Sequence, residues 1–245
     1  MFEQQIDIAT KDGATTTFIC HPDRGGPFPV IIFFMDAPAI REELRDMARR
    51  LACSGYYVML PNLYYRAGVM ELGPLPAPDD VAGRQRMMDL MYSLKIPMVM
   101  ADGDALLAYA DTQDAAGDGQ AGCLGYCMSG QFAINFAAHH PERINAAASL
   151  YGTYLVTDEA DSPHLAARNA DAELYFACAE TDRWAPLEMV EALSQSLAGA
   201  GIDAEVEIYP GVEHGFAFPG RAAYDKAAAE KHWSRLLALF ERRLK

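Results

Sequence analysis

The sequence predicts an α/β fold with a mostly parallel, doubly wound sheet and helices on both faces. The continuous apolar run 30–35 suits a strand that is covered on both sides. Amphipathic segments alternate with apolar runs along the chain, which is the order of a parallel sheet with crossover helices. A glycine-rich turn at 122–131 joins one such strand to the following helix. Ligands of this architecture gather at the carboxyl ends of the strands.

The predicted strands begin with a pair at 5–9 and 14–20 around the turn residues Lys11, Asp12 and Gly13. The other predicted strands share an apolar pattern and a boundary of glycine, proline or polar residues: 30–35, 56–60, 119–124, 146–151, 173–179 and 204–209.

The predicted helices share amphipathic periodicity: 40–54, 84–91, 103–111, 128–140, 186–197 and 222–242. Pro97 interrupts the chain between the second and third of them, and Gly199 with Gly201 ends the fifth. The last helix is expected to bury one face, with Trp233, Leu236, Leu237 and Phe240.

A long surface loop is predicted over 62–81, because the run 73–78 alternates proline with other residues and cannot form regular structure. Such loops are often lids or binding loops. Neither an internal repeat nor a convincing boundary is visible, so we expect one domain over 1–245.

Composition excludes several classes of protein. A net charge of -14 argues against a nucleic-acid binder, which needs a basic patch. The five cysteines form no C-x-x-C pair, so neither a zinc site nor any other metal is expected. Residues 1–9 lack the pattern of a signal peptide, and no apolar stretch of about 18 residues could span a membrane. We therefore expect a cytoplasmic protein without a membrane or nucleic-acid partner.

Cys127 occupies the nucleophile place of a G-x-nucleophile-x-G turn, in which Ser129 replaces the second glycine and Gly130 follows. The helix dipole favours a thiolate there, and the free N–H of Met128 could bind an oxyanion. Ser129 is a weaker candidate nucleophile, because it falls inside the helix. The alternative is that Cys127 is a small buried hydrophobic residue.

A cysteine nucleophile needs a base and a group that orients the base. Asp182 and His214 each follow a predicted strand, in the order nucleophile, acid, histidine. Asp182 alone could instead be a turn residue or cap the helix near Pro186, and Glu180 competes with it. His139 and His140 are expected at a helix C-terminus, His21 and His164 in loops, and His232 on a polar helix face.

These motifs resemble the dienelactone hydrolase family, cysteine-dependent members of the α/β-hydrolase fold, over roughly 6–239. The resemblance is carried by five motifs: Gly125-Tyr126-Cys127, Leu63-Tyr64 with Arg66, Tyr151-Gly152, Thr181-Asp182 with Pro186, and His214 with Phe216. It implies a hydrolase in which Cys127 is the nucleophile, His214 the general base and Asp182 its orienter. It also implies an oxyanion hole from the N–H groups of Met128 and Ala37, and no cofactor.

Asp36 stands where the family has an acidic residue that contacts the resting thiol. A nearby carboxylate raises the pKa of a thiol and opposes the helix dipole. We therefore expect Asp36 to modulate Cys127, with substrate binding shifting Asp36 and freeing the thiolate. The alternative is that Asp36 caps or tethers the loop that follows it.

The resemblance implies substrate-binding roles for Arg86, Tyr126 and Phe218. Family enzymes hold the carboxylate of dienelactone with two arginines. Arg86 matches the first, whereas Phe218 stands at the place of the second and Arg221 lies nearby but off register. A single arginine would be a weaker anion clamp. Arg84 and Arg86 could also form a solvated helix face, and three tyrosines could either line the pocket or pack elsewhere: Tyr64, Tyr65 and Tyr151.

The sequence thus favours a hydrolase that cleaves a small-molecule ester or lactone through a Cys-His-Asp triad. One alternative is a general carboxylesterase without lactone preference, which Phe218 supports. Another is a hydrolase-fold binding module without turnover. A third is a thiol redox protein, against which the lack of a C-x-x-C pair argues. The oligomeric state stays open between a monomer and a small homo-oligomer.

Overall fold

The computed structural model describes residues 1–73, 75–77 and 79–245, which form two compact units, 1–118 and 119–245. Pro74 and Pro78, which belong to the predicted long loop, lie outside the described residues.

The first unit contains a four-stranded arrangement in the order β1-β2-β4-β3. Its strands are β1 (Phe2–Thr10), β2 (Gly13–His21), β3 (Val30–Phe34) and β4 (Tyr57–Pro61). β1 pairs antiparallel with β2 and β2 with β4, whereas β3 and β4 are parallel. Every residue of β3 and β4 is buried, which explains why both read as unbroken apolar runs. The predicted N-terminal strand pair is confirmed, and each of its strands is longer than expected.

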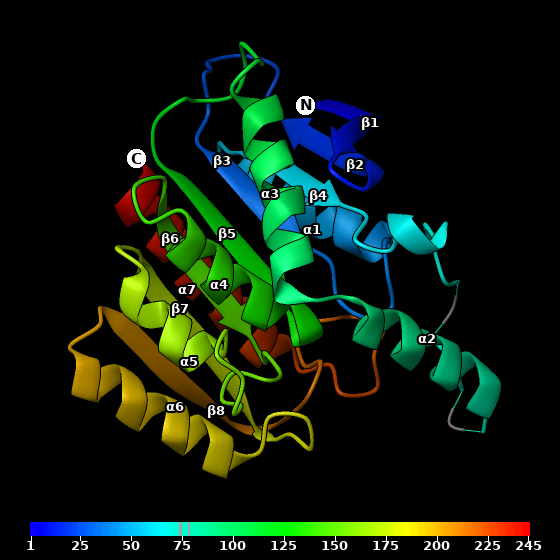
Figure 1. Cartoon of the computed structure of the whole chain (residues 1–245), viewed down its shortest axis with the longest axis vertical. Helices are drawn as coiled ribbons and strands as arrows, with labels where there is room; N and C mark the ends of the chain where they lie inside the picture. Colours follow the sequence, from blue (N-terminus) through cyan, green and yellow to red (C-terminus); the bar gives the residue numbers. More distant parts are fainter. Residues whose placement is uncertain (74, 78) are drawn as a thin grey trace. The chain divides into compact units, whose positions relative to one another are not determined.

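Helices cover both faces of these strands. Figure 1 shows α1 (Glu42–Cys53) on one side, where it packs on β2 and β4, and α3 (Ile96–Ala110) on the other, against β1 and β3. Along the chain, η1 (Tyr65–Ala67) and α2 (Val81–Ser93) come between α1 and α3. The predicted interruption between the two helices falls at Leu94 and Lys95, and Pro97 lies in the first turn of α3, where its missing N–H costs no helical hydrogen bond.

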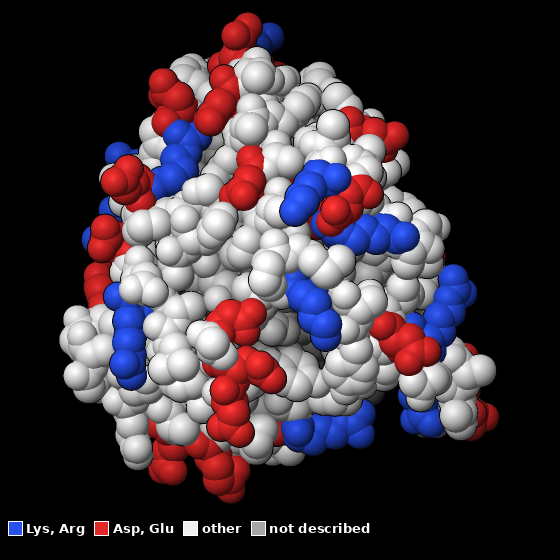
Figure 2. All heavy atoms as spheres, viewed as in Figure 1, with Lys and Arg blue, Asp and Glu red and all other residues white. Residues whose placement is uncertain are grey.

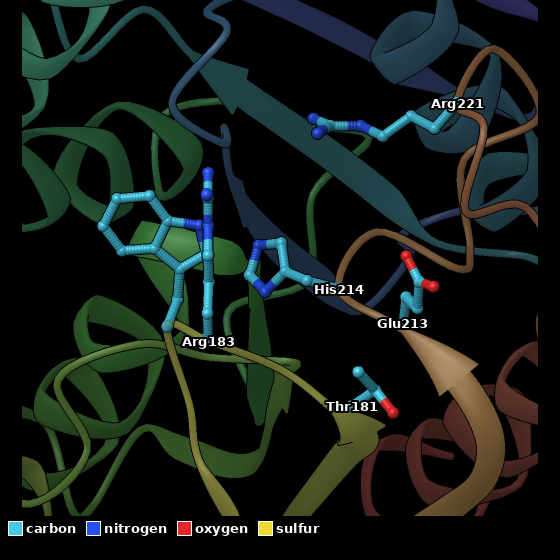
Figure 3. A pocket seen from close by; sticks show the side chains of 6 residues that line it. Thr181, Arg183, Glu213, His214 and Arg221 are labelled. Atoms are coloured by element: carbon cyan, nitrogen blue, oxygen red, sulfur yellow. The ribbon is translucent and has the colours of Figure 1, made fainter. Parts of the chain in front are cut away.

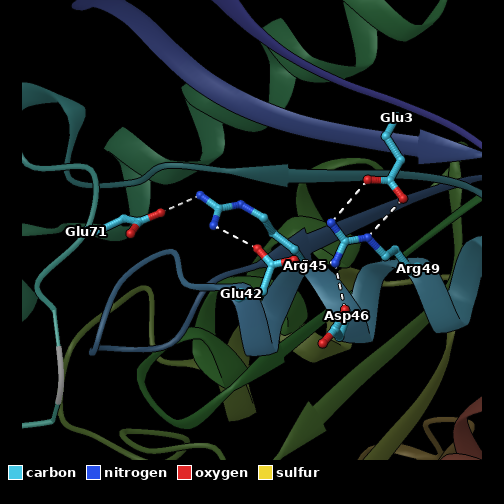
Figure 4. Close-up of polar contacts among 6 residues, drawn as sticks. All are labelled: Glu3, Glu42, Arg45, Asp46, Arg49 and Glu71. Atoms are coloured by element: carbon cyan, nitrogen blue, oxygen red, sulfur yellow. Dashed lines mark hydrogen bonds and ion pairs between the residues drawn. The ribbon is translucent and has the colours of Figure 1, made fainter.

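Two arginines on the outer side of α1 form a surface network of ion pairs (Figure 4). Arg49 contacts both carboxylate oxygens of Glu3 on β1, at 2.9 and 3.1 Å, and Arg45 contacts Glu71 of the following loop at 2.5 Å. Glu42 and Asp46 complete the network within the helix. Exposed pairs of this kind contribute little individually, but together they tether α1 to β1 and to the loop.

The second unit contains four parallel strands in the order β5-β6-β7-β8. They are β5 (Ala121–Tyr126), β6 (Ile144–Leu150), β7 (Glu173–Thr181) and β8 (Ala204–Glu213), so all four predicted strands are confirmed. Because the strands are parallel, their carboxyl ends lie at one edge, and the loops that follow β5, β7 and β8 carry Cys127, Asp182 and His214.

Helices cover both faces of these strands as well. In Figure 1, α4 (Gly130–His139), α5 (Pro163–Ala166) and α6 (Leu187–Ala200) lie in front of the strands and α7 (Lys226–Leu244) lies behind them. Two short 3-10 turns, η2 (Cys127–Ser129) and η3 (Ala167–Asn169), complete the unit. Gly199 does not end α6 as predicted, because it lies inside the helix; Gly201, with a φ of +67°, ends it.

Two predictions for the last helix are wrong. His232 was expected on its polar face but is fully buried, and Leu237 was expected to be buried but is half-exposed. Trp233, Leu236 and Phe240 are buried as predicted. Two further histidines lie in regular structure rather than in loops, since His21 ends β2 and His164 belongs to α5.

The charged surface agrees with the composition. Figure 2 shows acidic side chains interspersed with lysine and arginine over the visible face, without the continuous basic area that a phosphate backbone requires. Among the described helices, none combines the length and the apolar character needed to cross a bilayer.

Candidate active site

The backbone at Cys127 has the geometry of a sharp strand-to-helix turn. β5 ends at Tyr126, and Cys127 begins η2 with a φ of +55°, a value that residues other than glycine rarely adopt. The Cys127 carbonyl accepts a hydrogen bond of 3.0 Å from the N–H of Thr153, which holds the strained residue in place. Cys127 as a residue is partly exposed. Strain of this kind persists only where the surroundings enforce it, and it often marks a functional site.

The glycines of the turn are required by close approach of the backbone. A Cβ atom on Gly125 would lie 2.0 Å from the carbonyl oxygen of Ser129. A Cβ atom on Gly130 would lie 2.5 Å from the Cα of Gly152. Ser129 itself is buried inside the turn, so serine is accommodated where the general pattern has glycine.

Asp182 and His214 form the central contact of the site. The Oδ2 atom of Asp182 lies 2.6 Å from the Nδ1 atom of His214. The other oxygen, Oδ1, accepts hydrogen bonds from the N–H groups of Trp184 (2.8 Å) and Ala185 (3.1 Å). The side chain of Asp182 is fully buried, and it is a turn residue that also contacts the histidine. It does not cap α6, whose N-cap is Pro186.

The surroundings of His214 favour its protonated form. Burial opposes the charge, but the hydrogen bond to Asp182 and the hydrogen bond and charge interaction with Cys127 outweigh it and raise the pKa of His214 to about 9. The imidazole therefore interacts with both the nucleophile candidate and the acid candidate. A carboxylate at Nδ1 holds the ring in the tautomer whose Nε2 atom is available for proton transfer.

Glu180, the competing acid, takes a different position. Its side chain is exposed, and its Oε2 atom accepts a 2.7 Å hydrogen bond from the N–H of Gly211. The register between β7 and β8 shifts beside it, between Ala179 and Thr181. Glu180 thus ties β7 to the part of β8 that leads to His214, and Asp182 is the acid that contacts the histidine.

A cavity of about 410 Å³ opens beside His214 (Figure 3). It is lined by six residues of the second unit: Thr181, Arg183, Trp184, Glu213, His214 and Arg221. The guanidinium of Arg183 lies 5.0 Å from the centre of the Trp184 ring, and that of Arg221 lies 5.1 Å from the centre of the Phe218 ring. In Figure 3 the Arg183 and Arg221 side chains lie on different sides of His214. The sequence did not indicate Arg183 or Trp184, although both directly follow Asp182.

The remaining predicted residues of the second unit lie under this site. Met128 is buried next to Cys127 at the start of the turn. Tyr126 is fully buried, with its hydroxyl 2.8 Å from His232 Nε2, and its ring packs against Phe218 at 5.2 Å between centroids. Phe218 is fully buried as well. Roles for Tyr126 and Phe218 in substrate binding stay predictions.

Three predicted residues lie in the first unit. The carboxylate of Asp36 is fully buried and pairs with Arg41, at 2.5 Å from Oδ1 and 3.2 Å from Oδ2. This pair tethers the loop after β3, which is the alternative considered for Asp36, and an effect on the thiol stays a prediction. The Ala37 carbonyl accepts a 3.0 Å hydrogen bond from Tyr64, and Arg86 is exposed on α2.

Comparison with known proteins shows the family. The model of the Dienelactone hydrolase family matches residues 15–244. An Escherichia coli (strain K12) protein named "Putative carboxymethylenebutenolidase" is 30% identical over 88% of this chain and 78% of its own. A Methylorubrum extorquens protein with the same name is 27% identical over 95% of this chain and 78% of its own.

Solved structures agree with the sequence relatives. The crystal structure titled "Putative Dienelactone Hydrolase" from Klebsiella pneumoniae has a TM-score of 0.88 at 26% identity, covering 98% of each chain. An acylaminoacyl peptidase of Pyrococcus horikoshii, at 17% identity and a TM-score of 0.73, shares the fold over 42% of its own chain and all of this one. The chain therefore has the predicted α/β-hydrolase fold, and it belongs to the dienelactone hydrolase family of hydrolases.

Proposed function

We propose that this hydrolase cleaves an ester or lactone bond of a small molecule through Cys127, His214 and Asp182. The observation that carries the proposal is the 2.6 Å contact between Asp182 and His214, at the edge of the strands where β5 turns sharply into Cys127. The hydrogen bond between His214 and Cys127 extends this contact to the thiol. A nucleophile, a base and an orienting carboxylate in series are the arrangement that acyl transfer requires.

In the proposed reaction, His214 takes the proton of the Cys127 thiol, and the sulfur attacks the carbonyl carbon. The N–H group of Met128 stabilises the oxyanion that forms, and the family resemblance implies Ala37 as the second donor. When the tetrahedral intermediate collapses, the carbon–oxygen bond breaks and His214 gives its proton to the leaving oxygen. Water, deprotonated by His214, then attacks the thioester, releasing the acid and restoring the thiol. Asp182 stabilises the imidazolium that forms in each half of the cycle.

The cavity beside His214 supports an anionic substrate. Arg183 and Arg221 both line it, and guanidinium groups bind carboxylates with paired hydrogen bonds. Glu213 lines it too and reduces the net positive charge. A substrate with a carboxylate near the reacting carbonyl, such as an anionic lactone, matches this lining. The second candidate, a general carboxylesterase, is favoured by the apolar Phe218 at the place of a family arginine.

The proposal treats the whole chain, 1–245, as one catalytic domain. The family match runs from 15 to 244 and so covers both compact units. A binding module without turnover would not need the strained cysteine, the buried acid and the histidine together, and for this reason we place it last.

The test is to trap the acyl-enzyme. The protein is mixed with a short activated ester, quenched in acid during turnover and digested, and the peptides are examined by mass spectrometry. The proposal predicts one acyl group on the peptide that contains Cys127. An acyl group on another residue during turnover would contradict the proposal. So would the absence of an acyl-enzyme in the wild type if the Cys127→Ala variant is still active.

A further inference from the structure

A second histidine, distant from the triad in the sequence, lies beneath the nucleophile turn. His232 belongs to α7 and is completely buried. Its Nε2 atom lies 2.8 Å from the hydroxyl of Tyr126, the residue that directly precedes Cys127. Its Nδ1 atom lies 2.5 Å from the backbone carbonyl of Ala229. Both ring nitrogens therefore have defined partners.

These partners determine where the protons lie. A carbonyl oxygen only accepts hydrogen bonds, so Nδ1 of His232 must carry a proton and donate it to Ala229. In the neutral ring with its proton on Nδ1, Nε2 is an acceptor. The Tyr126 hydroxyl donates to it. The side chain of Tyr126 is thus held at its far end by a buried hydrogen bond that only an acceptor at this place can provide.

Tyr126 belongs to an aromatic cluster that also reaches the base of the triad. Its ring lies 5.6 Å from that of Tyr151 and 5.2 Å from that of Phe218, between centroids. Tyr151 in turn meets the imidazole of His214 edge-on, at 4.9 Å. One layer of packed rings therefore connects the residue before the nucleophile with the residue that deprotonates it. Packed interiors transmit displacements rather than absorbing them.

The helix that supplies His232 is itself anchored to the loop that carries the base. The N–H of Asp225, the N-cap of α7, donates a 3.1 Å hydrogen bond to the carbonyl of Phe216, two residues after His214. Asp225 Oδ1 caps the helix by accepting from the N–H of Ala228 at 2.8 Å. The ring of Phe216 also meets that of His232 edge-on, at 6.1 Å. The first two turns of α7 are thus fixed relative to both the nucleophile turn and the base loop.

We propose that His232 is a positioning residue of the active site. It holds Tyr126 by accepting its hydroxyl proton, and through Tyr126 it maintains the strained Cys127 turn at the distance from His214 that proton transfer requires. This inference rests on the proposed function, because it assumes that Cys127 and His214 are the reacting pair. A purely structural histidine would stabilise the fold without changing the reactivity of the thiol, and this difference can be measured.

The experiment compares three variants of the full chain. His232→Leu removes the acceptor, Tyr126→Phe removes the donor, and His232→Gln supplies an acceptor oxygen close to the former Nε2 position. Tyr175→Phe is the matched control, since it removes another buried tyrosine hydroxyl. This hydroxyl, on β7, lies 2.7 Å from the Tyr209 hydroxyl and 2.8 Å from Glu207, both on β8.

The first readout is the rate at which iodoacetamide alkylates Cys127, measured peptide by peptide, with the exposed Cys53 as internal reference. This rate reports thiolate reactivity without any substrate. The second readout separates kcat from KM for an activated ester. A misplacement of reacting groups by about 1 Å can reduce turnover on the order of 100-fold. We expect roughly 10- to 100-fold lower kcat in His232→Leu and Tyr126→Phe, a slower Cys127 alkylation and little change in KM.

The double variant Tyr126→Phe with His232→Leu should be no slower than either single variant, because the two groups act as one unit. His232→Gln should recover most of the lost rate, and Tyr175→Phe should alkylate Cys127 at the wild-type rate. Wild-type reactivity in Tyr126→Phe, failure of His232→Gln to exceed His232→Leu, or equal slowing in Tyr175→Phe would each overturn the proposal. If His232→Leu does not fold, Tyr126→Phe and His232→Gln decide it. Full turnover by Cys127→Ala would instead overturn the proposed function.

Discussion

Asp182 uses its two carboxylate oxygens for two different purposes: Oδ2 contacts His214 Nδ1 at 2.6 Å, and Oδ1 accepts two backbone N–H groups of its own loop. The acid that orients the base is thereby itself oriented by the peptide chain. A carboxylate held by these three contacts cannot rotate away from the imidazole without losing hydrogen bonds. The geometry of the base is therefore built into the loop after β7.

Replacing Asp182 by asparagine tests this arrangement. The amide keeps the size of the side chain but does not stabilise the imidazolium, and it favours the wrong tautomer of His214. We expect kcat to fall on the order of 10⁴-fold, measured with an activated ester. Glu180→Gln is the matched control, because this exposed acid contacts Gly211 and not the histidine. A larger loss of kcat in Glu180→Gln than in Asp182→Asn would show that Glu180, and not Asp182, orients the histidine.

The raised pKa of His214, about 9 against an ordinary value of 6.5, makes stability depend on pH. A group whose pKa is higher in the folded state stabilises the fold fully below the unfolded pKa and loses this contribution as pH rises through the folded pKa. We expect the free energy of unfolding to decline between pH 6.5 and 9, as measured by urea denaturation. His214→Gln should flatten this decline, and Asp182→Asn should reduce it. An equal decline in all three proteins would show that His214 is not its source.

Two glycines with opposite surroundings allow a direct comparison. Gly125→Ala places a Cβ atom 2.0 Å from the Ser129 carbonyl, so we expect a loss of at least about 3 kcal/mol in stability or no folded protein. Gly199→Ala meets no atom within 4 Å inside α6 and should stabilise the protein by about 0.5–1 kcal/mol. Thermal denaturation of the two variants measures both. A stable Gly125→Ala protein would mean that the turn is looser than described.

The arginines of the cavity should determine selectivity for charge. We expect Arg183→Leu and Arg221→Leu each to raise KM about 10-fold for an ester that carries a carboxylate, since a charge-assisted hydrogen bond contributes roughly 1.5–3 kcal/mol. KM for a neutral ester of the same size should change little. Arg86→Leu on α2 is the comparison, because family resemblance assigns it the same task. A rise in KM for the charged ester only in Arg86→Leu would show that the anion site is not the cavity beside His214.

The sequence was sufficient where the signal is local. Cys127, Asp182 and His214 each follow a strand, and parallel strands bring the residues after their carboxyl ends to one edge, so their order predicted that they share this edge. The family resemblance implied their roles. The glycines of the turn were recognisable because their signal is local as well. Proline both breaks helices and begins them, so the sequence indicated the interruption near Pro97 but not that Pro97 itself lies in the first turn of α3.

The sequence was insufficient where long-range packing decides. His232 lies on α7 among charged neighbours, and nothing in its periodicity indicates that Tyr126, more than a hundred residues earlier, provides a partner for it inside the core. Arg183 and Arg221 belong to two loops whose conformations bring both into one cavity. Residues of this kind are found from contacts, because neither their type nor their spacing marks them.

The central claim is that Cys127 performs the reaction, and its most direct test is hydrolysis by wild type and Cys127→Ala. The panel would contain a short activated ester, a neutral enol lactone and dienelactone. We predict that wild type hydrolyses at least one of them and that the variant hydrolyses none. The preference for dienelactone over the neutral lactone then reports the anion site. A Cys127→Ala protein as active as wild type would contradict the account.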